Sequence, residues 1–270
     1  TLCLYLLERE HPIAGGVILG LAAALKVFPA LLIAMLFWRR RFRAGWAALG
    51  TAAGITLLSA GVAGWSTSLD YLGLLRQMGY GSSTWSGLGQ HYHIAPANQS
   101  PAALITRLLT VAPEAGLAGI ASMPRLASIL SAAVALLLLG VSFYLSRPSA
   151  GAKAPGESRL IYGSFILTAL LVPSLMWDHY LTIALLPLVL YLNRLNRERP
   201  GPIELGLAAA AVFLINVPYN FWDPAFSKGW AVALASVKLP GVLLLFGLLF
   251  RRCGPPERWA TPEICRVAKV

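Results

Sequence analysis

The sequence predicts an all-α protein, a polytopic membrane helical bundle of six or seven spans. Hydrophobic residues make up 57% of the 270 positions and charged residues only 12%, whereas soluble domains carry about 25% charged residues. Long apolar runs recur along the chain, and about 20 helical residues cross a hydrocarbon core of roughly 30 Å. These runs do not alternate apolar with polar residues, which disfavours transmembrane β-strands.

The expected spans follow the apolar runs, and two of them are short or broken. In chain order they cover residues 13–37, 44–63, 124–145, 160–173, 177–192, 203–218 and 230–250. Together they make a single membrane domain over residues 1–270.

Basic residues gather in alternate connections between these spans, and they account for the net charge of +11. The four clusters are Arg39, Arg40, Arg41 and Arg43; Arg147, Lys153 and Arg159; Arg194, Arg197 and Arg199; and Arg251, Arg252 and Arg258. By the positive-inside rule these connections face the cytoplasm, including a linker at 146–159 and a tail at 251–270. The basic excess therefore reports topology, and no nucleic-acid partner is expected.

The connection at 64–123 faces the other side and is too long for a simple turn. Long loops of this kind often carry function, although a structural cap is an equal alternative. Two amphipathic stretches, SLDYLGLLRQM and PAALITRLLTV, are expected to form short helices on the membrane surface.

Lys26 stands in the middle of the first apolar run, three residues before Pro29. A charge at this depth costs several kcal/mol unless it faces a polar cavity or a partner, so Lys26 is a candidate functional residue. Proline removes a backbone donor and breaks the helix beside it. Two geometries fit: one kinked span, or a re-entrant hairpin of two half-helices with LKVFP at its tip. A lysine that snorkels to the surface is the alternative without function.

A polar stretch at 88–109 in the long outer loop precedes a helical pattern. Its candidate binding residues are His91, His93, Asn98, Gln99, Ser100 and Arg107. Ser100 is a plausible N-cap with Pro101 at the first helical position, and the same helix N-terminus could hold a phosphate. The two histidines lack recognisable further ligands, so no metal site is expected.

Asp178 and His179 begin a span on the outer side of the membrane. An acid beside an imidazole can exchange protons or hold a phosphate through the protonated ring. Alternatively, Asp178 caps the helix while Trp177 and Tyr180 form the interfacial aromatic belt. A second outer loop at 216–230 carries aromatic residues with Asp223, and an interface anchor is favoured there over a sugar site.

Several chemistries find no support in the sequence. Cys3, Cys253 and Cys265 show no disulfide or metal-site spacing. There is no Walker loop and no dinucleotide fingerprint, so no cofactor is expected. No second lysine–proline segment is recognised, which disfavours the paired broken helices of a transporter. The chain opens on Thr1 without a methionine or a signal peptide, and we expect it to be an N-terminally truncated fragment.

The order of AGGVILGLAAALKVFPALL, RRRFRAG, NQS and PSLMWDHYLTIALLP over residues 12–187 resembles glycosyltransferase family 87. These are bacterial polyprenol-phosphate-mannose-dependent mannosyltransferases, often labelled a domain of unknown function. The resemblance implies a C-type glycosyltransferase fold in the bacterial cytoplasmic (inner) membrane. It also implies a polyprenyl-phosphate sugar donor, used without a nucleotide cofactor, and a lipid or glycan acceptor on the outer face.

The resemblance assigns expected roles to the candidate residues. Lys26, His179 and Arg107 would bind the carrier phosphate, because a cation in a low-dielectric groove stabilises the charge that develops on the leaving oxygen. The sugar or acceptor would be held by His91, His93, Asn98, Gln99, Ser100 and Asp178. The general base, an acid in the first outer loop of such enzymes, would lie upstream of Thr1, with His179 as a further catalytic candidate.

Two other function classes stay open at this point. An intramembrane lysine in a broken helix also fits a transporter or lipid flippase, which predicts matching broken helices in two halves. A fragment that binds carrier lipid without catalysis is the third possibility.

Overall fold

The computed structural model describes residues 1–76, 79–81, 91–147, 155–197 and 200–252. The helices are α1 Leu2–Glu8, α2 Pro12–Leu25, α3 Ala30–Trp38, α4 Phe42–Ala63, α5 Trp65–Arg76, α6 Pro101–Leu108, α7 Pro124–Leu145, α8 Pro155–Leu171, α9 Leu185–Arg197, α10 Pro202–Asn216 and α11 Lys238–Arg252. Four 3₁₀ segments, η2 Pro113–Ala115, η3 Asp178–Ala184, η4 Pro224–Phe226 and η5 Gly229–Ser236, and two short strands, β1 Val111–Ala112 and β2 Leu117–Ala118, complete it.

The predicted helical membrane bundle is confirmed, but uninterrupted spans are fewer than expected. Among the described residues, α4 and α7 are long and apolar enough to cross a membrane, and η5 with α11 makes a third span bent by 54°. Other apolar helices, such as α2 and α10, are shorter. The apolar runs in the sequence continue through turns and 3₁₀ segments, so they overstate the number of straight spans.

The N-terminal group of helices, α1 to α4, is held by close backbone contact between α2 and α4. A methyl group placed on Gly16 would lie 2.3 Å from the carbonyl oxygen of Ala44, and one on Gly20 would lie 2.3 Å from that of Ala48. Small residues allow this approach, as they do between membrane helices generally. Both pairs advance in the same direction along the chain, so α2 and α4 run parallel.

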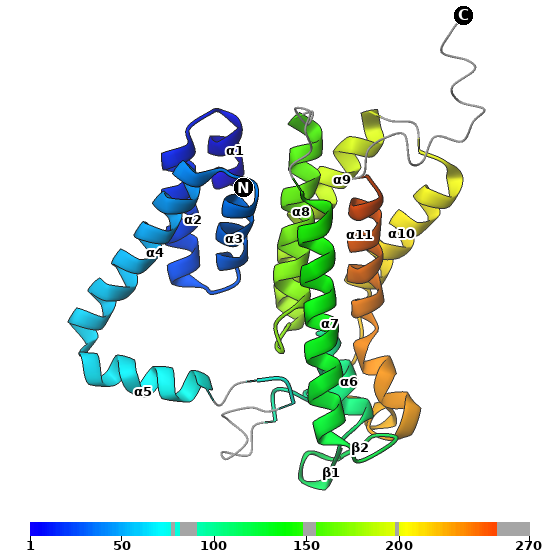
Figure 1. Ribbon diagram of the computed structural model, residues 1–270. Helices are drawn as coiled ribbons and strands as arrows, with labels where there is room; N and C mark the ends of the chain where they lie inside the picture. The colour runs from blue at the N-terminus through cyan, green and yellow to red at the C-terminus, as the bar shows by residue number, and fades with distance from the viewer. Residues whose placement is uncertain (77–78, 82–90, 148–154, 198–199, 253–270) are drawn as a thin grey trace, which may run out of the picture.

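The Lys26 segment is the tip of a helical hairpin that α2 and α3 form. Lys26 leaves the helix with φ −154° and ψ 131°, and α3 begins directly after Pro29. The backbone N–H of Ala30 donates to the carbonyl of Val27 at 2.9 Å, which closes the turn. Figure 1 shows α3 returning beside α2. The re-entrant hairpin is therefore correct, and the single kinked span over residues 13–37 is wrong.

The tip of this hairpin lies at an intermediate depth. The 14 residues of α2 span about 21 Å at 1.5 Å per residue, less than the roughly 30 Å of a hydrocarbon core. Gly20 packs against Ala48 and Thr51, so Lys26, six residues further on, is level with the middle of α4. The lysine is thus presented within the depth that α4 covers.

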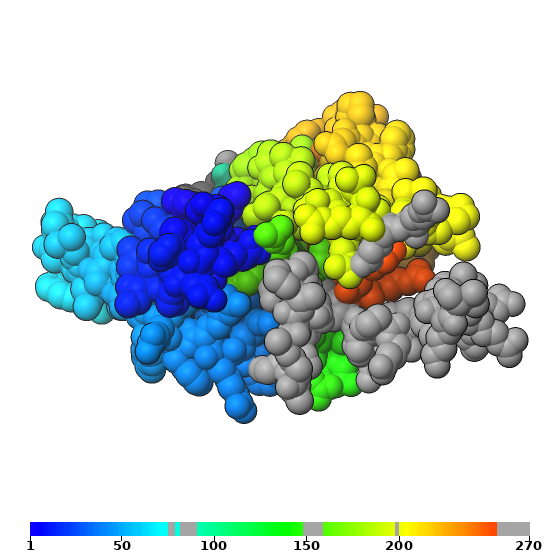
Figure 2. Space-filling view, turned by 90° about the horizontal axis from the view of Figure 1, so that it is seen from above, coloured from blue at the N-terminus to red at the C-terminus, as the bar shows by residue number. Residues whose placement is uncertain are grey.

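The second group of helices packs around α8. Leu160, Phe165 and Leu170 of α8 are almost completely buried and share one core with α9, α10 and α11. At one end the two groups meet where the indole N–H of Trp38 donates to the carbonyl of Phe143 at 2.9 Å. Figure 2 shows the N-terminal group, in blue, lying against the second group.

The described members of the basic clusters lie at one end of the molecule. The C-terminal ends of α3, α7, α9 and α11, which carry or precede them, come together at the end where α8 begins (Figure 1). Carboxylates pair with part of this charge: Glu8 binds Arg159 at 2.6 Å, and Glu204 binds Arg252. This shared end agrees with the alternation expected from the positive-inside rule. Residues 148–154 of the linker at 146–159 and most of the tail at 251–270, including Cys253 and Cys265, lie outside the described residues.

The opposite end holds α5, α6 and the short β-hairpin (Figure 1). The exposed apolar side chains of α5, such as Leu69 and Tyr71, fit the expected surface helix. In contrast, α6 is packed inside the protein against α7 and η5, because its small residues Ala102 and Ala103 permit close approach. The expectation that the PAALITRLLTV stretch lies on the membrane surface is therefore wrong.

Replacing both Gly16 and Gly20 by Ala should destabilise the protein by about 1–3 kcal/mol, because each added methyl group overlaps a carbonyl oxygen of α4. Thermal unfolding in detergent micelles measures this change. The matched control is Gly50→Ala with Gly54→Ala on α4, where no described atom lies within 4 Å of the added carbon. The control should be neutral or slightly stabilised, since alanine favours helix. Equal melting temperatures for both double variants would contradict the close packing of α2 on α4.

Candidate functional site

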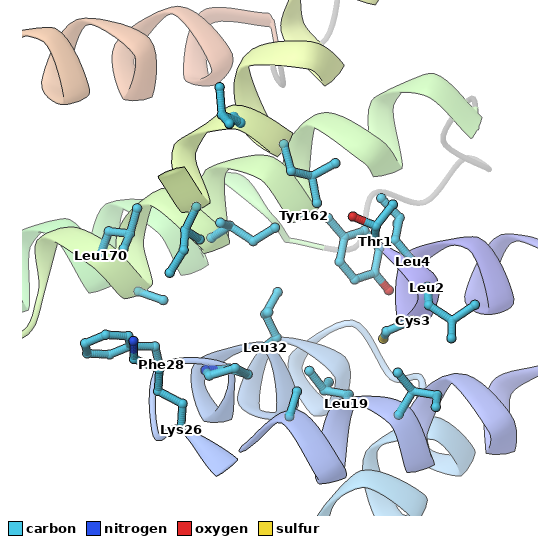
Figure 3. A pocket seen from close by; sticks show the side chains of 18 of the residues that line it. Thr1, Leu2, Cys3, Leu4, Leu19, Lys26, Phe28, Leu32, Tyr162 and Leu170 are labelled. Carbon is cyan, nitrogen blue, oxygen red and sulfur yellow. The ribbon is translucent and has the colours of Figure 1, made fainter. Parts of the chain in front are cut away.

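A long apolar groove runs between the two helix groups. Its volume is about 720 Å³, and its walls come from α1, α2, α3, α8, η3 and the start of α9. Figure 3 shows Lys26 and Phe28 at one end and Thr1, Cys3 and Tyr162 toward the other. Most other lining side chains are aliphatic. The groove therefore offers one cation beside a hydrocarbon-like channel.

The ammonium of Lys26 is held by aromatic rings. Its Nζ lies 3.7 Å from the ring centroid of Tyr180 and 5.3 Å from that of Phe28. The two rings meet edge to face with their centroids 5.4 Å apart. A cation over a ring face is attracted by the ring quadrupole without being neutralised. These ring contacts therefore leave the Lys26 ammonium able to meet a further anion.

His179 contacts the same tyrosine. Its ring centroid is 4.5 Å from that of Tyr180, so one aromatic ring connects the two residues expected to hold a phosphate. His179 also lines a smaller neighbouring cavity of about 260 Å³ with Asp178, Asn216 and Lys238. Thr182 lines both this cavity and the apolar groove. The 3₁₀ segment η3 is therefore the wall between them.

Asp178 is paired with a lysine that was not predicted from the sequence. The Nζ of Lys238 lies 2.6 Å from Oδ1 of Asp178. Lys238 and Pro240 stand at the start of α11, directly after the 54° bend from η5. The expectation that no second lysine–proline segment exists is therefore wrong. The Asp178 carboxylate serves this ion pair, in the first turn of η3.

The NQS motif is completely buried and bonded to the protein itself. Asn98 donates to the carbonyl of Ser174 at 2.9 Å and accepts from the N–H of Met176 at 3.0 Å. Gln99 donates to the carbonyl of Ala235 at 2.7 Å. Ser100 caps α6 by accepting from the N–H of Ala103 at 3.0 Å, as expected of an N-cap. These side chains tie the loop before η3 to the end of η5, and none of the three lines a described cavity.

Arg107 is also buried, with 1% of its surface exposed. Its guanidinium donates to the carbonyl oxygens of Ala95 at 2.7 Å and Asn98 at 3.0 Å, and to the hydroxyl of Ser236. Desolvation lowers the pKa of Arg107 to about 10, so the group stays protonated at neutral pH. Arg107 lines an outer cavity rather than the apolar groove. The structure therefore does not bring it to Lys26.

The two outer histidines lie near each other but are not equivalent. Their ring centroids are 6.3 Å apart. Burial, and to a smaller extent the charge of His91, lowers the pKa of His93. His91 lines the same outer cavity as Arg107. Among the described residues, no group of three side chains suited to metal binding comes together.

Sequence reasoning missed Tyr180, Phe28 and Lys238 as parts of the site. Tyr180 was read as a belt residue because its position next to Trp177 fits that pattern equally well. The signal for Lys238 was present, since it is a second charge inside an apolar run and precedes a proline.

Comparison with known proteins gives one match. The family model of glycosyltransferase family 87 matches residues 1–173, which is well over half of the chain and includes Lys26, the NQS motif and Arg107. No curated protein and no solved structure matches. The match confirms the family expected from the lysine–proline segment and the motifs that follow it. The chain therefore belongs to glycosyltransferase family 87, a family of membrane glycosyltransferases.

Proposed function

We propose that the protein transfers a hexose, mannose by the resemblance of its motifs, from a polyprenyl-phosphate carrier to a lipid or glycan acceptor. The observation that carries this proposal is the position of Lys26 at one end of the apolar groove. The polyprenyl chain would lie against the aliphatic walls between the two helix groups. The phosphate would then meet the Lys26 ammonium, with His179 beside Tyr180.

The reaction is an inverting displacement at the anomeric carbon. An acceptor hydroxyl attacks this carbon, the bond to the phosphate oxygen breaks, and the hydroxyl proton passes to a base. Polyprenyl phosphate leaves with one more unit of negative charge. A fixed cation in a site that excludes water stabilises this charge as it develops. No nucleotide or redox cofactor enters the balance.

The described residues do not assign the general base. None of the groove-lining residues is an aspartate or glutamate, and Asp178 is engaged by Lys238. We therefore keep the expectation, drawn from the family resemblance, that an acid in another outer loop accepts the proton. The proposed setting is the bacterial inner membrane, with the basic end of the bundle toward the cytoplasm.

The second lysine–proline segment also bears on the transporter alternative, which predicts two broken helices. The two lysines differ in their surroundings, because Lys238 is paired with Asp178 while Lys26 contacts the rings of Tyr180 and Phe28. The family match and this asymmetry favour glycosyl transfer over a symmetric transport mechanism.

Replacing Lys26 by Met should lower sugar transfer by roughly 10²–10³-fold, the loss typical of removing one preorganised charge-stabilising group. Transfer of radiolabelled mannose from polyprenyl-phosphate-mannose, in membranes that contain the complete gene product, measures this effect. The matched control is Lys228→Met, an exposed lysine of the outer loop that lines none of the described cavities. Full activity of Lys26→Met would refute the phosphate role. Absence of transfer by a folded wild-type protein would instead favour lipid transport.

Tyr180→Leu should lower transfer by roughly 2- to 30-fold, because the ring positions the Lys26 ammonium through an interaction of about 0.5–2 kcal/mol. Tyr180→Phe keeps the ring and should retain activity. If Tyr180 positions the lysine, Tyr180→Leu alone lowers the rate of sugar transfer. A Lys26→Met, Tyr180→Leu double variant should then be only slightly slower than Lys26→Met. Additive losses would show that Tyr180 acts independently of the lysine.

His179→Phe should raise the KM for the donor by about tenfold, since one charge-assisted hydrogen bond to phosphate is lost. The aromatic contact with Tyr180 is preserved in this variant. An unchanged KM and kcat would return His179 to a purely structural role.

A further inference from the structure

A third cavity lies at the end of the molecule opposite the basic clusters. We call it the outer pocket; it has a volume of about 390 Å³, within the roughly 300–1,000 Å³ common for small-molecule sites. Its walls come from residues 91–96, from the turn of the β-hairpin around Glu114, and from residues 221–227, with Arg107 and Trp177 as further lining residues. The N–H of Ala118 donates to the carbonyl of Ser227 at 2.9 Å and joins two of these segments.

Aromatic side chains form much of the lining. Tyr92 and Trp177 meet edge to face with centroids 5.4 Å apart. Phe221 is buried, whereas Trp222 beside it keeps 66% of its surface exposed. A flat ring with a free face can stack on the C–H face of a pyranose, because the negative ring face attracts the positive C–H edge.

Polar groups of both signs stand among these rings. Glu114 and Asp223 are exposed and come from different segments of the wall. Asp223 already accepts from the N–H of Ala225 through Oδ1 at 2.9 Å, which fixes its carboxylate. Arg107 is nine-tenths buried or more, and its Nε has no hydrogen-bond partner among the described residues. A buried donor without a partner costs about 1–3 kcal/mol, so a ligand or water is expected to meet it.

This combination suits a sugar better than a membrane anchor. An aromatic belt residue needs only an apolar ring and a polar tip, and it gains nothing from two carboxylates and a buried guanidinium. A hydroxylated ring presents an apolar face and many donor and acceptor groups, which match the rings, Glu114, Asp223 and Arg107.

We propose that the outer pocket binds the saccharide portion of the acceptor, an inference that rests on the proposed glycosyl transfer. One short segment, residues 177–182, runs from this pocket to the donor site. Trp177 lines the outer pocket, His179 lines the smaller cavity of about 260 Å³, and Thr182 lines the apolar groove. The seven residues of η3 extend about 14 Å at a 3₁₀ rise of roughly 2.0 Å. The acceptor glycan is thereby held within a few sugar units of the Lys26 end of the groove.

The test is saturation-transfer difference NMR on the full chain in detergent micelles. The probes are methyl α-mannoside and linear manno-oligosaccharides, with glycerol as a polyol control. Wild-type protein should transfer saturation to the sugar ring protons and not to glycerol. Trp222→Ala and Asp223→Asn should each weaken saccharide affinity by roughly tenfold, the size of one central contact. The asparagine keeps the oxygen that accepts from Ala225.

The matched control is Trp230→Ala, which removes an exposed tryptophan from the same region that does not line the pocket. It should bind sugar as the wild type does, and unchanged melting temperatures establish that all variants are folded. The inference is overturned if no saccharide binds, or if Trp222→Ala and Asp223→Asn bind saccharide as tightly as the wild type. This holds even if Lys26→Met has abolished transfer. If the wild type binds saccharide but transfers no sugar, the outer pocket is still a saccharide site and only the proposed reaction is overturned.

Discussion

The free-energy cost of an ammonium group at mid-membrane depth governs this structure. Lys26 could not stay in an unbroken lipid-facing helix without a cost of several kcal/mol. Here the chain turns at Lys26 and Pro29, and the tip faces Tyr180 and Phe28. The rings stabilise the cation, and in the described part of the chain no carboxylate forms an ion pair with it. A second lysine in a comparable place, Lys238, is instead paired with Asp178, so Lys26 is the one that we propose to meet an anionic ligand.

The buried NQS motif acts at a distance from the groove. Residues 97–99 and 176–178 lie side by side through two backbone hydrogen bonds, at 2.7 and 3.2 Å, and Asn98 and Gln99 add side-chain bonds on both sides of this pairing. Because η3 begins at once after this pairing, its start is fixed relative to the core. The motif that helped to identify the family is thus a device for placing Tyr180 and His179. Its polar atoms are used within the protein.

The sequence was sufficient for the fold class and the family, since composition, apolar runs and short motifs are local signals. It left two geometries for the lysine segment, because the choice depends on the contact of Gly16 and Gly20 with a helix about 28 residues away in the chain. It also failed to separate polar residues that meet a ligand from those that bond to the backbone. Asn98 and Lys26 are both polar residues in unusual places, and only long-range packing distinguishes their roles.

The order of the three cavities along η3 has a consequence for the chemistry. In an inverting displacement the acceptor oxygen and the leaving phosphate oxygen lie on opposite sides of the anomeric carbon. A carrier phosphate at Lys26 and an acceptor held from the Trp177 end would approach that carbon from different directions, with η3 between their binding regions. A single rigid segment would then set both the distance and the direction of attack.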